Sequence, residues 1–224
     1  MKRVCAVMLS TTMLLCGLVG QANANQDLNG SSAPSGLHGV REFFKSGKFR
    51  VPPNITGVLV VMWAGGGGGG AGYANGNTCF AGGGGGGSAW TKHVHAVIPG
   101  DKLTIVVGLG GTAGTNGDGG AGGDSQIVDG SKVLVYAGGG QGGTAANSGG
   151  NGTRGAGGSP DPKAMISHAP SSQDNNYGIP YASNLLPDDL GGDSQSFSIG
   201  GYGGYPCNGT QPTNGGPGYV SLEW

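Results

Sequence analysis

The stretch VLVVMWAGGGGGGAGYANGNTCFAGGGGGGSAW, from Val58 to Trp90, decides the fold. It joins an apolar run to two hexaglycine runs that are separated by a short insert. Glycine has no side chain to bury or to use in catalysis, and it disfavours α-helix. Main chains can approach closely along such runs, and buried N–H and C=O groups must be paired. We therefore expect polyglycine II segments, which are extended helices packed through main-chain hydrogen bonds. Flexible linkers are the alternative.

The composition favours an ordered chain over a disordered one. The 54 glycines and 12 prolines among 224 residues fall in the range typical of low-complexity sequences. However, only 10% of the residues are charged and 36% are apolar, which is the opposite of the disorder signature. The 11 basic and 12 acidic residues nearly cancel, so the charge gives no indication of a nucleic-acid partner or an anionic membrane.

The first 24 residues have the features of a secretory signal peptide. Lys2 and Arg3 precede an apolar core over residues 4–19, and Ala22-Asn23-Ala24 matches a small-x-small cleavage pattern. The apolar core is shorter than the roughly 20 residues that span a bilayer, so we expect no membrane span. Cleavage near Ala24 predicts a protein that is secreted, periplasmic or held at the cell surface. The expected organisation is a signal peptide, a flexible leader and a glycine-rich β domain over residues 1–24, 25–40 and 41–224.

Signal cleavage leaves two cysteines, Cys79 and Cys207. In an oxidising compartment the simplest expectation is that they form a disulfide with each other. Such a bond would close a very long loop, which contributes on the order of 4 to 5 kcal/mol in the chain-entropy model. The alternative is a pair of free thiols.

The remaining pattern predicts an all-β chain with glycine-rich irregular structure. Val58–Trp63 is apolar on both faces, as in a strand buried on both sides. We expect a hairpin that turns at Ser46-Gly47, and a type II turn at Pro99-Gly100 between two further strands. Six Asn-Gly pairs indicate that tight turns are common. No stretch has a sustained helical period, so we expect a short β-sandwich or β-base carrying packed, polyglycine II-like loops. The last strand should place three apolar residues on one face: Val220, Leu222 and Trp224.

The order of these motifs resembles a known family. The segments are FFKSGKFRVPPNITGVLVVMWAGGGGGG, GGGGGGSAW, IPGDKLTIVVGLGG, GGAGGDSQI, AGGGQGG and GGPGYVSLEW. Together they resemble the glycine-rich domains of phage tail-fibre proteins and of exported bacterial proteins, over roughly Arg41 to Trp224. The resemblance implies a β-structured base and, as in tail-fibre adhesins, a polyglycine II sandwich whose exposed loops bind bacterial surface receptors. Tail-fibre proteins carry no secretory signal, so the resemblance predicts the fold more than a phage role.

If the glycines form a scaffold, function should lie in the segments that interrupt them. One is the insert between the hexaglycines, and the other spans residues 159–190. Both are rich in tyrosine and asparagine, which give rigid aromatic area and adaptable hydrogen bonds in recognition loops. The alternative for residues 159–190 is a surface excursion packed back on the sheet. The candidate ligand-binding residues are Tyr73, Asn75, Asn77, Phe80, Asn175, Asn176, Tyr177 and Tyr181.

Catalytic and cofactor patterns are weak in this chain. There is no GxSxG elbow, P-loop lysine or HExxH helix, and no helical pattern follows the glycine runs to complete a dinucleotide site. His93 and His95 are two apart on a strand and face the same side, as a metal pair would. A solvated face fits them better, because no third ligand lies nearby in the sequence. We therefore expect no cofactor and no metal.

The sequence thus predicts a secreted, non-enzymatic module for adhesion or recognition of a cell-surface glycan or protein receptor. The first alternative is a self-assembling coat, matrix or appendage component, in which strand edges mediate association. The second alternative is an exported hydrolase with a dispersed active site, which no motif supports.

Overall fold

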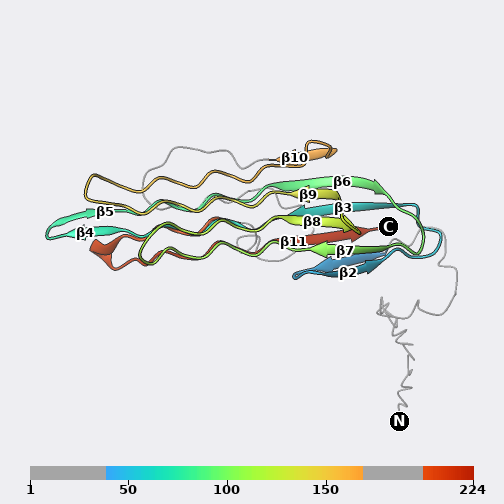
Figure 1. Cartoon of the computed structure of the whole chain (residues 1–224), viewed down its shortest axis with the longest axis horizontal. Coiled ribbons are helices and arrows are strands. Elements are labelled where there is room, and N and C mark those ends of the chain that lie inside the picture. Colours follow the sequence, from blue (N-terminus) through green and yellow to red (C-terminus); the bar gives the residue numbers. More distant parts are fainter. Residues whose placement is uncertain (1–38, 169–198) are drawn as a thin grey trace, which may run out of the picture. The chain divides into compact units, whose positions relative to one another are not determined.

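The computed structural model describes residues 39–168 and 199–224, which belong to one unit that begins at His38. Its strands form two larger antiparallel sheets and one separate hairpin (Figure 1). The strands are β1 (Val40–Phe43), β2 (Gly47–Arg50), β3 (Gly57–Trp63), β4 (Tyr73–Asn75), β5 (Thr78–Phe80), β6 (Trp90–Ala96), β7 (Lys102–Val106), β8 (Ser125–Asp129), β9 (Lys132–Ala137), β10 (Ile166–His168) and β11 (Tyr219–Glu223). A single 3-10 turn, η2 (Pro206–Asn208), accompanies them in the described part of the chain.

The two larger sheets have the orders β1-β11-β3-β6-β10 and β2-β7-β8-β9. The hairpin expected at Ser46-Gly47 is wrong, because β1 pairs with β11 and β2 pairs with β7. The turn instead carries the chain from one sheet to the other. Burial explains this crossing: Phe43 on β1 and Phe49 on β2 both enter the core, one from each sheet.

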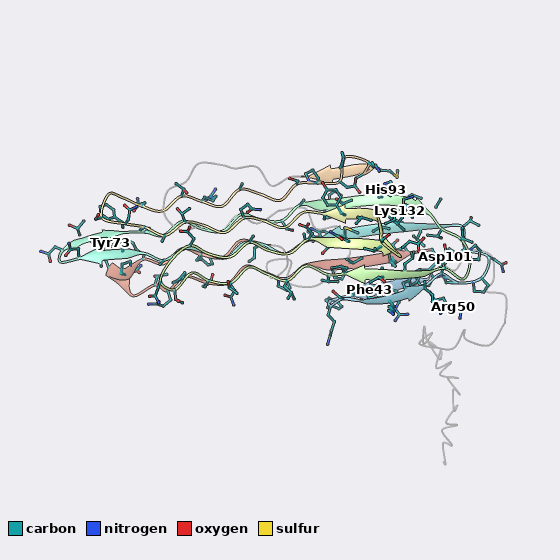
Figure 2. All side chains as sticks on the ribbon, viewed as in Figure 1. Phe43, Arg50, Tyr73, His93, Asp101 and Lys132 are labelled. Atoms are coloured by element: carbon teal, nitrogen blue, oxygen red, sulfur yellow. A yellow bond between two sulfur atoms is a disulfide. The ribbon has the colours of Figure 1, made fainter. Side chains whose placement is uncertain are left out.

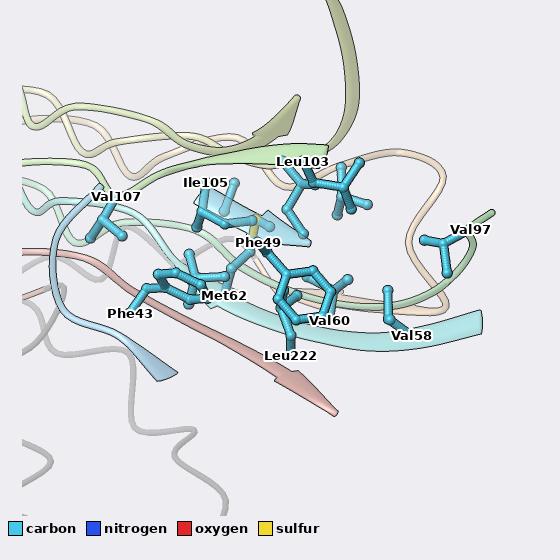
Figure 3. Packing of buried hydrophobic residues seen from close by; sticks show 14 of the residues in the cluster. Phe43, Phe49, Val58, Val60, Met62, Val97, Leu103, Ile105, Val107 and Leu222 are labelled. Atoms are coloured by element: carbon cyan, nitrogen blue, oxygen red, sulfur yellow. The ribbon is translucent and has the colours of Figure 1, made fainter. Parts of the chain in front are cut away.

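The hydrophobic core lies between the two sheets (Figure 3). Alternate residues of β3, which include Val60 and Met62, meet Leu103 and Ile105 of β7. The other face of β3 contributes Trp63, only 1% exposed, to a second cluster of buried residues, which are Val61, Trp63, Trp90 and Tyr219. The strand is therefore buried on both faces, as its apolar run predicts.

Two further sequence predictions are confirmed. Gly100 has a φ of 90°, and the Asp101 N–H donates to the Ile98 carbonyl over 3.1 Å, which closes the expected type II turn. At the C-terminus Val220 and Leu222 are fully buried in the core. Trp224 packs against the same cluster, with its ring centroid 5.1 Å from that of Phe49.

Beyond the sandwich, the glycine-rich segments run side by side as one bundle (Figure 1). Their hydrogen-bond partners advance by three residues at a time, which is the period of the polyglycine II helix. We call this set the glycine bundle. The segments that leave the sandwich are 64–72, 108–114, 138–146 and 199–204, and those that return are 81–89, 119–124, 151–158 and 211–218.

Residues 64–72 form the central segment of the glycine bundle. Its N–H groups donate to three returning segments, and its carbonyls accept from three outgoing segments. These six neighbours also bond to one another and close a ring around it. The N–H groups of Gly65, Gly66 and Gly67 donate to the carbonyls of Gly123, Gly216 and Gly86, in that order. The carbonyls of the same three residues accept from the N–H groups of Gly140, Gly111 and Gly201.

The close approach of these main chains explains why the runs are glycine. A β-carbon built on Gly67 would lie within 3.0 Å of the Gln141 carbonyl oxygen, and one built on Gly68 would clash in the same way with Thr112. The obstacle is backbone in both cases, so no side chain can rotate away to make room. The hexaglycines are therefore packed polyglycine II helices rather than flexible linkers.

Candidate functional site

The outgoing and returning segments of the glycine bundle are joined at the end remote from the sandwich (Figure 1). There the glycines give way to residues with side chains. We call this surface the tip and define it by its four connections. These are residues 73–80, 115–118, 147–150 and 205–210.

The first connection is the β4–β5 hairpin, which contains the predicted insert. Gly76, with a φ of 59°, is the first central residue of its two-residue turn, where an L side chain would be strained. Asn75 and Asn77 are exposed beside it. The half-buried rings of Tyr73 and Phe80 lie across the hairpin with centroids 6.5 Å apart (Figure 2 labels Tyr73).

The predicted disulfide between Cys79 and Cys207 is confirmed. It joins β5 to η2, so it fastens the first connection to the last, across 128 residues of sequence. The tip is therefore held covalently where the glycine bundle ends. Disulfides of this kind are typical of proteins outside the cytoplasm.

The other connections are shaped by short side-chain hydrogen bonds. The Asn208 Oδ1 accepts from the Thr210 N–H at 3.0 Å, and the Asn147 Oδ1 accepts from the Gly149 N–H at 2.8 Å. The Asp118 Oδ1 accepts from the Ala145 N–H at 2.7 Å, which links the connection 115–118 to the outgoing segment 138–146. Sequence reasoning missed these residues as part of the site. The available signal was that each of them interrupts a glycine run.

The chemistry of the tip is almost neutral. Asp118 is its sole Asp, Glu, Lys, Arg or His, and the remaining polar groups are amides, hydroxyls and main chain. Within residues 39–168 and 199–224, no group of three or more His, Cys, Asp and Glu side chains could hold a metal ion. The arrangement can therefore form neutral hydrogen bonds and aromatic contacts with a ligand.

Only the start of the second predicted recognition segment, residues 159–168, is described. The Gly138 N–H donates to the Ser159 carbonyl and β10 pairs with β6, so this part lies against the sandwich and not at the tip. The segment's candidate residues Asn175, Asn176, Tyr177 and Tyr181 lie outside the described residues, as does the expected signal peptide at 1–24. Both stay predictions.

His93 and His95 share one face of β6, as expected, but that face is not simply solvated. They pair in register with Val60 and Val58, so they lie on the side of the sheet that faces the core. Both are half-buried, with ring centroids 5.9 Å apart. Burial, and then the charges of His93 and of Lys132 on the other sheet, lower the pKa of His95 from its ordinary value of 6.5.

The lowered pKa of His95 predicts a pH dependence of stability. The unfolded chain takes up this proton more readily, so the contribution of His95 is fully present above about pH 6.5 and is lost as the pH falls through the folded-state value. We expect His95→Gln to reduce the loss of melting temperature between pH 7 and pH 5. An unchanged acid response in this variant would contradict the prediction, and Lys92→Gln, on the opposite face of β6, is the matched control.

A β-sandwich that carries a hydrogen-bonded polyglycine II bundle defines the class of this protein. The profile of the Glycine-rich domain family matches residues 44–223, so the chain belongs to this family. No curated protein matches the chain. Among the described residues, no helix has the length and apolarity needed to cross a membrane.

Proposed function

We propose that this protein is an exported, non-enzymatic recognition module that binds a cell-surface glycan or protein receptor through the tip. The observation that carries the proposal is the convergence of all four connections of the glycine bundle at one end. The central segment of the glycine bundle offers only main chain and alanine methyl groups, and exposed side chains such as Tyr202 are scattered along the outer segments. At the tip, amides, hydroxyls and the rings of Tyr73 and Phe80 instead lie together in the four connections. A rigid scaffold that presents variable loops is a common arrangement for binding.

Two further features support an exported binding protein. The disulfide is compatible with the secretory signal that residues 1–24 predict. The polyglycine II bundle also matches what the resemblance to phage tail-fibre adhesins implies, in which exposed loops bind receptors on bacteria. The near-neutral tip favours hydrogen-bonding ligands over strongly charged polymers, because attraction of a polyanion would need clustered Lys and Arg.

Binding of the labelled chain 25–224 to bacterial and host cells tests the proposal. We expect saturable binding that Asn75→Ala combined with Asn77→Ala weakens about tenfold, since each lost hydrogen bond contributes about 0.5 to 1.5 kcal/mol. Both side chains are exposed, so the melting temperature should not change. Replacing residues 169–190 with a short linker keeps β10 in place and tests the second predicted loop in the same assay.

The matched control changes exposed residues of the sandwich instead of the tip. Lys48→Ala combined with Thr104→Ala alters two neighbouring exposed positions on β2 and β7 and should leave binding intact. Binding that survives the tip substitutions would overturn the proposal, whatever the result of the loop replacement.

Self-assembly as a coat, matrix or appendage component is the second candidate. It is favoured by the position of β1 at the edge of its sheet and by Val40, which is 56% exposed there. The unpaired main-chain groups of an edge strand are a template for pairing with another chain. Oligomers that grow with protein concentration in light scattering would support this function, and a stable monomer would count against it.

A further inference from the structure

The described part of the chain contains five Asn-Gly pairs, and the structure divides them into two groups. In three pairs the glycine N–H donates to a main-chain carbonyl: Gly152 to Ala81 at 2.8 Å, Gly215 to Gly111 at 2.8 Å and Gly209 to Pro206 at 3.1 Å. In the pairs Asn75-Gly76 and Asn116-Gly117, the glycine N–H has no acceptor among the described residues. Both of these pairs lie at the tip.

The five glycines also differ in how much room each would leave for a β-carbon. A β-carbon built on Gly152 or Gly215 would clash with main chain, so these two residues are packed inside the glycine bundle. Nothing lies within 4 Å of a β-carbon built on Gly76, Gly117 or Gly209. Gly209 is thus open but hydrogen-bonded, which separates the effect of space from the effect of the hydrogen bond.

We propose that Asn75 and Asn116 are sites of spontaneous deamidation, and that the fold protects Asn151, Asn208 and Asn214. The glycine nitrogen attacks the asparagine Cγ, and an N–Cγ bond forms as the bond from Cγ to Nδ2 breaks. The glycine N–H proton leaves with the ammonia. Water then opens the cyclic succinimide at either carbonyl, which yields aspartate or isoaspartate. The step needs a glycine nitrogen that can lose its proton and reach Cγ. A glycine N–H that is held by a hydrogen bond to a main-chain carbonyl meets neither condition.

Both asparagines are exposed where the chain turns at the tip. Asn75 is exposed at the end of β4, and Gly76 follows it at the hairpin turn. Asn116 is exposed within a bend, and the φ of Gly117 does not lie in the left-handed region. As the protein ages, the reaction adds negative charge at the tip beside Asp118. This chemistry depends only on the fold and not on the proposed binding function.

Peptide mapping of the aged chain by mass spectrometry tests the inference, because trypsin separates the two groups of sites once the disulfide between Cys79 and Cys207 is reduced. Peptide 51–92 contains Asn75 and peptide 103–132 contains Asn116, each as its sole Asn-Gly pair. The protected sites fall in peptides 133–154 and 164–224. The chain is incubated in mildly alkaline buffer and compared with a zero-time sample. We expect aspartate and isoaspartate to form at Asn75 and Asn116 at least about tenfold faster than at the three protected sites, since a protected N–H group reacts only through local opening.

Two controls make the outcome decisive. The reduced chain in denaturant should react at similar rates at all five sites, and a difference that persists there would assign the selectivity to local sequence and overturn the inference. Gly117→Ala fits the open space at that position and should suppress the reaction in peptide 103–132 while leaving peptide 51–92 unchanged. Equal native rates at all five sites, or unchanged reaction in Gly117→Ala, would also overturn it.

Discussion

Gly67→Ala should destabilise the protein by at least about 3 kcal/mol, although it adds a single methyl group. The methyl would meet the Gln141 carbonyl at a distance that real β-carbons do not show. The central segment would have to move away from residues 138–146. That movement weakens the hydrogen bond from Gly67 to Gly86 at 2.9 Å and the one from Gly201 to Gly67 at 2.7 Å.

Thermal unfolding followed by circular dichroism measures this effect. For a domain of this size, 3 kcal/mol corresponds to a fall in melting temperature of about 6 to 12 °C. Gly117→Ala is the matched control, since the same methyl meets open space there and should leave stability unchanged or raise it by about 0.4 to 1 kcal/mol. Equal melting of the two variants would mean that the central segment is not packed as described.

Loss of the disulfide should have the second large effect. Cys79→Ser combined with Cys207→Ser removes a bond between residues 128 apart, and the chain-entropy model gives about 5 kcal/mol for a loop of that length. The stabilisation acts mainly through the unfolded chain, which the bond prevents from expanding. We expect a fall in melting temperature of about 10 to 20 °C.

The reducing agent dithiothreitol supplies the internal control. It should lower the melting temperature of the natural chain to that of the double serine variant, and it should not affect the variant itself. A natural chain that melts at the same temperature with and without the reductant would contradict the stabilising role of the bond. Chain entropy would then be offset by changes elsewhere in the tip.

Several features could be predicted because they depend on local composition or on counting. The all-β class follows from short apolar runs without a helical period, and β3 has the two-sided apolar pattern of a buried strand. The pairing of Cys79 with Cys207 follows because the expected signal cleavage leaves no other cysteine. Polyglycine II packing follows from the need to pair main-chain groups that no side chain can shield.

Other features could not be predicted, because they depend on partners far away in sequence. The turn near Ser46-Gly47 has hairpin chemistry, yet the core draws Phe43 and Phe49 into opposite sheets. His93 and His95 read as a solvated pair, because nothing local shows that the facing sheet comes close enough for Lys132 to act on His95.

The sequence by itself therefore determined what each segment is: strand, polyglycine helix, turn or cysteine pair. Only the tertiary structure decided which glycine segment neighbours which, and hence that residues 64–72 lie at the centre of a ring and that four connections share the tip. The physical reason is that hydrogen bonds between glycine segments use main-chain groups that are the same at every residue. Their register and neighbours are selected by the sandwich, which sets where each segment starts and ends.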